Sequence, residues 1–139
     1  MSADFDIELA LITSVRNLGL PALQNVVIEE PNTTAEPNSL GSLWLKATVV
    51  RGETEPVTLG SFGEDNHNGF LQIDVNVPIN TGIGLVSNLA GDIKKLYPAG
   101  RKIGQAVVSR SSVGAGRTVG GWYRLSVTIY FYSRIARNA

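Results

Sequence analysis

The chain of 139 residues is 43% hydrophobic and 17% charged, has a formal net charge of zero and contains no cysteine. We expect one domain over residues 1–139 that buries a sizeable core, and the absence of cysteine excludes disulfides and thiolate metal sites. The longest apolar runs are far too short to span a bilayer, and the first residues are acidic, so we expect neither membrane insertion nor a signal peptide.

The first predicted element is a helix over residues 4–18, along which apolar residues recur at three- and four-residue spacing. Gly19 and Pro21 end it. A short strand is predicted at 24–29. The following stretch up to residue 42 contains two Pro residues and many small polar ones, which predicts an exposed loop.

Three strands follow in the prediction. Apolar and polar residues alternate over 43–50, the segment RGETEP turns the chain, and residues 57–62 return it. The polar segment GEDNHNG forms a second turn. The third strand starts near Gly69 and has the strictest alternation of the chain, LQIDVNV, before a proline and two glycines. Three neighbouring strands with short polar turns indicate an antiparallel meander.

The second half opens with a helix predicted over residues 85–96, followed by a strand over 103–109 and a flexible glycine-rich connector, SSVGAGRTVGG. The last strand, residues 122–132, is the longest, and its odd-numbered residues form an apolar face. This element order predicts an α+β fold, a largely antiparallel mixed sheet with two helices packed on one face.

Charge is distributed unevenly along the chain. Residues 1–70 contain ten acidic and three basic residues, a net charge of −7, whereas residues 71–139 contain two acidic and nine basic residues, a net charge of +7. The two halves either face each other within one fold or attract opposite halves of neighbouring copies. The second case favours head-to-tail association, since a heterologous contact joins two different faces.

Two glycine-containing loops do not match the known phosphate-binding patterns. Gly82 and Gly84 lack the third glycine of G-x-G-x-x-G, so turn geometry and helix entry explain them better. The glycines of Gly114–Gly120 are also wrongly spaced, and a strand follows them. That segment is either a plain mobile hairpin or an arm that becomes ordered against a partner, with Arg117 supplying a charge.

No catalytic or metal site emerges from the acidic residues and the single histidine. His67 lies near Glu64 and Asp65, but the flanking Asn and Gly residues indicate turn formation rather than a metal site. Asp74 and Asp92 are the two acids of the second half, and nothing pairs them as acid and base. We therefore predict neither an enzyme nor a cofactor.

The basic residues of the second half are spread over a helix, strands and a tail, without a known DNA-binding motif. Sequence-specific binding of nucleic acid is not expected, while weak contact with phosphates stays open. The surface that stands out is the polar face of the last strand. It carries residue types favoured at interface centres, and we predict an oligomer interface there, formed by Trp122, Arg124, Tyr130 and Tyr132.

Several segments together resemble the bacteriophage tail terminator family over residues 5–133. They are GFLQIDVNVP at Gly69–Pro78 with Gly82 and Gly84 after it, LAGDI at Leu89–Ile93, and GWY at Gly121–Tyr123. The resemblance implies a small domain that assembles into a ring, usually a hexamer, at the end of the tail tube. Such a ring stops tube polymerisation in the virion and docks the head connector.

On this reading the partners are further copies of the chain, the tail tube protein and the head connector or stopper protein. We predict that two loops meet these partners, one with Glu64, Asp65 and His67 and the other with Arg110, Arg117 and Thr118. Two alternatives stay open: another neck component, such as a head-closure protein, and a small ligand-binding module that uses one of the loops.

Overall fold

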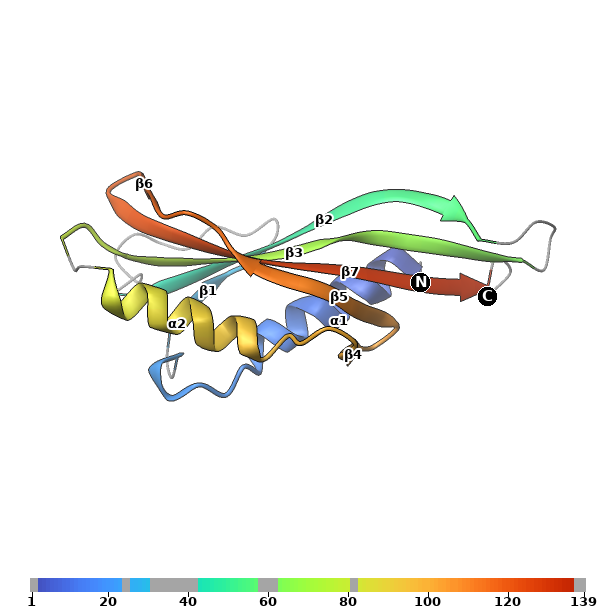
Figure 1. Cartoon of the computed structure of the whole chain (residues 1–139), viewed down its shortest axis with the longest axis horizontal. Helices are drawn as coiled ribbons and strands as arrows, with labels where there is room; N and C mark the ends of the chain where they lie inside the picture. Colours follow the sequence, from blue (N-terminus) through green and yellow to red (C-terminus); the bar gives the residue numbers. More distant parts are fainter. Residues whose placement is uncertain (1–2, 24–25, 31–42, 58–62, 81–82, 137–139) are drawn as a thin grey trace.

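The computed structural model describes residues 3–23, 26–30, 43–57, 63–80 and 83–136. A long, twisted sheet dominates it, accompanied by two α-helices and a short 3-10 helix (Figure 1). In chain order the elements are α1 (Ala3–Arg16), η1 (Pro21–Leu23), β1 (Val27–Glu29), β2 (Trp44–Pro56), β3 (Glu64–Pro78), α2 (Gly84–Lys95), β4 (Lys102–Ile103), β5 (Ala106–Val113), β6 (Arg117–Val119) and β7 (Trp122–Ala136).

The strands form one seven-stranded mixed sheet in the order β1-β2-β3-β7-β5-β4, with β6 paired to one end of β7. β1 and β2 are parallel, and the other pairs are antiparallel. The predicted α+β class is confirmed. β3 and β7 pair along their whole length, from Glu64 opposite Ala136 to Pro78 opposite Trp122. These two strands are the centre of the sheet.

One hydrophobic core unites the sheet with both helices. Because side chains alternate along a strand, the odd-numbered residues of β3 and β7 share one face. That face is the apolar one: Leu71, Ile73, Val75, Val77, Leu125, Val127, Ile129 and Phe131 are all buried. Ile7, Leu11 and Val15 of α1 and Val86, Leu89 and Ile93 of α2 join the same cluster. The predicted apolar face of the last strand is therefore confirmed.

The strands are much longer than the helices. β3 and β7 have 15 residues each, which corresponds to about 50 Å, whereas α1 and α2 have 14 and 12 residues and span about 20 Å each. At the far end of β2, Val50–Pro56 is exposed at every residue. The sheet thus extends well beyond the region that the helices pack against (Figure 1).

The predicted three-strand meander is wrong, because β2 and β3 form one long hairpin instead. Residues 51–56, predicted to turn, continue β2 past an irregularity between Arg51 and Thr54. The predicted strand 57–62 begins after β2 has ended, and residues 58–62 lie outside the described part of the chain. Residues 64–68, predicted as a loop, are the start of β3. Backbone pairing with β2 and β7 overrides their local turn propensity.

The glycine-rich connector is also more regular than predicted. β5 continues to Val113, so Arg110 lies in a strand, and Arg117 and Thr118 lie in β6, which pairs with β7. The long β7 supplies backbone partners for these residues. Of the other boundaries, α1 and α2 shift by one or two residues, and the strand predicted at 24–29 is Val27–Glu29. The predicted loop at 31–42 lies outside the described residues.

Tyr97 links the second helix to the first. Its side chain is fully buried, and its hydroxyl shares a hydrogen bond of 2.8 Å with the Ser14 hydroxyl of α1. The Arg101 guanidinium lies 4.9 Å from the centre of its ring. Burial raises the pKa of Tyr97 above the ordinary 10.0, because the phenolate is poorly solvated there.

Replacing Tyr97 with phenylalanine is expected to reduce the loss of stability at alkaline pH. The pKa of Tyr97 is higher in the folded state than in the unfolded state. The stability that the neutral phenol contributes is therefore fully present below pH 10.0 and is lost as the pH rises through the folded-state pKa. Urea unfolding at neutral and alkaline pH measures this difference. The Tyr132→Phe variant is the control, since Tyr132 is exposed. An equal alkaline loss in both variants would contradict the expectation.

Candidate functional site

The face of the sheet opposite the apolar core carries the even-numbered residues of β3 and β7. Two groups of side chains stand out on it. One is a polar cluster near the Trp122 end of β7, which we define as Gln72, Asp74, Asn76, Arg124 and Ser126. The other is a groove toward the opposite end of the same strands.

Asp74, Asn76 and Ser126 of the polar cluster are buried, Gln72 and Arg124 are partly buried, and the members bind one another. Asp74 accepts hydrogen bonds from the Ser126 hydroxyl at 2.5 Å and from the Gln72 amide at 3.0 Å. Arg124 Nε donates to Asn76 Oδ1 at 2.7 Å, and its Nη1 lies 3.8 Å from Asp74 Oδ2. The register explains these contacts, since Asp74 lies opposite Ser126 and Asn76 opposite Arg124. Sequence reasoning missed this cluster, because the pairing joins two strands that are far apart in the chain.

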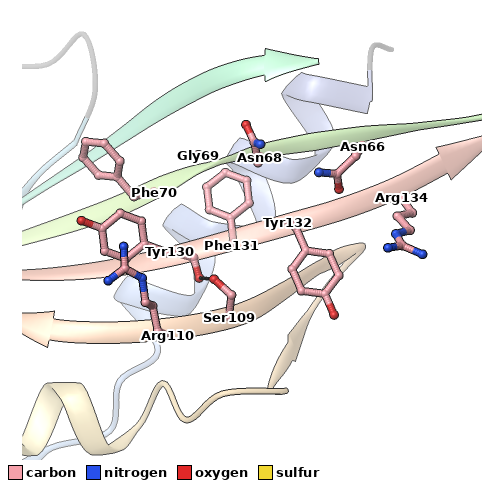
Figure 2. A pocket seen from close by; sticks show the side chains of 10 residues that line it. All are labelled: Asn66, Asn68, Gly69, Phe70, Ser109, Arg110, Tyr130, Phe131, Tyr132 and Arg134. Atoms are coloured by element: carbon pink, nitrogen blue, oxygen red, sulfur yellow. Dashed lines mark hydrogen bonds between the residues drawn. The ribbon is translucent and has the colours of Figure 1, made fainter. Parts of the chain in front are cut away.

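The groove is lined by residues of β3, β5 and β7 and encloses about 520 Å³ (Figure 2). Arg110 stacks over the ring of Tyr130, with the guanidinium carbon 4.1 Å from the ring centre. Phe70 contacts Tyr130 from β3, at 5.8 Å between ring centres. Tyr132 and Arg134 continue the surface along β7, and both are exposed. We call the surface formed by Arg110, Tyr130, Tyr132 and Arg134 the cationic groove.

A bulge in β5 puts Arg110 into this groove. Val108 lies opposite Phe131 and Arg110 opposite Tyr130, so Ser109 is an extra residue in the ladder. Its hydroxyl donates to the Tyr130 carbonyl at 3.1 Å. A bulge changes which residues point to which face, and here it brings the Arg110 side chain beside the aromatic rings. Periodicity in the sequence does not reveal such an inserted residue.

The four residues predicted as an oligomer interface fall into two pairs. Tyr130 and Tyr132 line the cationic groove. Trp122 instead contacts Trp44 edge to face, with ring centres 5.9 Å apart, and Arg124 belongs to the polar cluster with only 13% of its side chain exposed. All four lie on the even-numbered face, but their participation in an interface stays a prediction.

Of the residues predicted to meet partner proteins, Arg110 lies in the cationic groove, opposite Tyr130, and the others lie toward opposite ends of the long strands. Glu64, Asp65 and His67 start β3, and His67 Nδ1 lies 3.4 Å from Thr54 Oγ1. Arg117 and Thr118 lie opposite Arg124 and Tyr123 of β7, at the other end, and both are exposed. These two sets are joined by nearly the full length of β3 and β7 (Figure 1).

The described residues provide neither a metal-binding cluster nor a membrane-spanning helix. There, His, Asp and Glu side chains form no group of three or more that is placed to hold a metal ion. Neither helix combines the length and apolar character needed to cross a membrane, and the same holds for the remainder of the described chain. The glycine loop at residues 81–82 lies outside the described part.

The fold and the even-numbered face define an α+β protein whose exposed groove has the aromatic and arginine composition of a protein-binding surface. The phage tail terminator protein family matches residues 6–131, and the chain belongs to this family. Phage tail terminators are a structural family, and the resemblance noted in the sequence is thereby confirmed.

Comparison with solved structures supports the fold. One matching chain superimposes with a TM-score of 0.61 at 21% sequence identity, and the match covers 97% of this chain and 96% of the other. At that identity the similarity concerns the fold alone. No curated protein matches the sequence.

Proposed function

We propose that the protein forms a ring, usually of six copies in this family, at the end of the phage tail tube. The ring terminates tube polymerisation and docks the tail to the head connector. It acts in the virion as a structural component without catalytic activity. The observation that carries the proposal is the family match over residues 6–131.

The arrangement of the sheet supports a role between two partners. Both helices pack their buried side chains against the odd-numbered residues of β3 and β7. This packing favours a single domain with both helices on one face of the sheet. The even-numbered face is then available for contacts with other proteins. Glu64, Asp65 and His67 lie about 30–40 Å from Arg117 and Thr118 along the strands. One end contacts the tail tube protein and the other the connector or stopper protein in this proposal.

The charge asymmetry supports closure of a ring. A −7 and a +7 half within one chain complement each other between neighbouring copies, and heterologous contacts of this kind close into a ring when the rotation between copies permits. Basic residues of the second half that border the central opening would lie close to the DNA that passes through it, without reading its sequence.

Phage assembled without this protein is expected to accumulate overlong tail tubes and heads that lack tails. Electron microscopy of lysates measures tube length, and expression of the wild-type protein from a plasmid should restore normal length. Tails of normal length beside heads that leak DNA would reject tail termination and indicate a head-closure protein. Negative-stain images of the purified protein test the ring itself.

A further inference from the structure

The cationic groove has the chemistry of a receptor for acidic and apolar side chains. Arg110 and Arg134 are exposed at its two ends, and Tyr132, with 38% exposure, lies between them. A guanidinium stacked on a ring keeps its N–H edges directed outward, the geometry in which arginine binds a carboxylate through two hydrogen bonds. The rings provide an apolar contact beside that charge.

The first turns of α1 have the complementary composition. Phe5 and Leu9 are 47% and 45% exposed, although both are large and apolar. They are four residues apart and so lie on the same side of the helix, with the exposed Asp6 beside them. Ile7 and Leu11 are buried in the core on the other side. We call the surface formed by Phe5, Asp6 and Leu9 the acidic helix patch.

The two surfaces belong to different sides of the molecule. α1 packs its buried side chains into the cluster of odd-numbered strand residues, whereas the cationic groove lies on the even-numbered face of β3 and β7. A contact between the groove of one copy and the helix patch of the next is therefore heterologous. It leaves one unused groove and one unused patch at the ends of every open chain of subunits, so it repeats and closes into a ring where the rotation between copies permits.

We infer that the acidic helix patch of one copy docks in the cationic groove of its neighbour, and that this contact joins the subunits of the ring. The inference rests on the proposed ring function and assigns its interface. The Asp6 carboxylate binds an arginine of the groove and sets the register, and Phe5 and Leu9 cover Tyr130 and Tyr132. The docking joins an acid of the negatively charged half of the chain to arginines of the positively charged half.

Charge reversal on either surface is expected to abolish assembly. The groove variant carries Arg110→Glu and Arg134→Glu, and the helix variant carries Asp6→Lys and Leu9→Lys. Each should raise the concentration needed for half assembly on the order of a hundredfold in sedimentation velocity, because like charges then face each other. A variant with Lys94→Glu and Lys95→Glu, exposed on α2, has the same charge change as the groove variant and should assemble normally.

Mixing the two variants gives the sharpest result. The groove variant keeps an intact helix patch and the helix variant keeps an intact groove, and the reversed groove and the reversed patch again carry opposite charges. An equimolar mixture should therefore recover association that neither variant shows alone. Rings that persist in either variant would overturn the docking of α1 while leaving the proposed function intact. A wild-type protein that stays monomeric at every concentration would instead contradict the ring itself.

Cross-linking provides a second test, because the chain has no cysteine of its own. The Leu9→Cys, Tyr132→Cys double variant should give a ladder of covalent oligomers on a denaturing gel after treatment with a short bis-maleimide reagent, and each single variant should give only the band of the single chain. Dimers from a single variant would reveal a symmetric contact and overturn the inference. So would loss of DNA binding in the groove variant with its rings unchanged, which would make the groove a nucleic-acid site.

Discussion

Replacing Asp74 with alanine is expected to lower the free energy of unfolding by about 3–5 kcal/mol. The change leaves Arg124, whose side chain is 13% exposed, without its carboxylate partner in a buried position. It also removes the acceptor of the hydrogen bonds from Ser126 and Gln72. Equilibrium unfolding in urea measures the effect.

Asp92→Ala is the matched control, since Asp92 is an exposed acid on α2, and its effect should stay within about 0.5 kcal/mol. Replacing Asp74 and Arg124 together by leucine should cost less than Asp74→Ala, because no buried charge is then left unpaired. Equal midpoints for the Asp74→Ala and Asp92→Ala variants would show that the polar cluster contributes little to stability.

Gly69→Ala is the substitution with the next largest expected effect. A Cβ atom at this position would lie 2.2 Å from the Val50 carbonyl oxygen and 3.1 Å from Arg51 Cα, both backbone atoms of the neighbouring strand β2. β2 must therefore move away from β3 near its bulge. We expect a loss of about 1–3 kcal/mol, the usual range for overpacking, with a lower melting temperature.

The control is Gly91→Ala in α2, where an added Cβ has no heavy atom within 4 Å beyond the helix's own backbone and adjoining residues. Alanine favours a helix interior, so this variant should gain up to about 1 kcal/mol. Calorimetry of both variants gives the comparison. A Gly69→Ala protein as stable as the wild type would mean that the close approach of β2 and β3 is not needed.

Local patterns identified those elements whose side chains alternate between an apolar core and a polar surface. The apolar residues of LQIDVNV in β3 and Leu125–Phe131 at the odd-numbered positions of β7 are such cases and are buried as expected, whereas Asp74 and Asn76 on the polar face are buried as well. The pattern fails where a strand leaves the core. Residues 51–56 of β2 and 64–68 of β3 have little apolar character to indicate a strand, and it is hydrogen bonding to adjacent strands that orders them.

The candidate site was predictable in composition and not in geometry. Alternation alone put Tyr130 and Tyr132 on one face, and the structure places them in one groove. Arg110 reaches them through a bulge, and the partner of Asp74 is fixed by the register of β3 with β7. Both depend on long-range pairing, which a single sequence read locally does not contain.

The central position of β7 has a consequence for folding. Each residue of β3 pairs with a strand that the ribosome makes only after α2, β4, β5 and β6. During translation the edge of β3 in the β2–β3 hairpin therefore lacks its hydrogen-bonding partner until β7 has been synthesised. Pairing of β7 with β3 is a slow, non-local step of folding. Nascent chains are prone to aggregate through that edge until β7 arrives, so only completed molecules are competent to associate correctly.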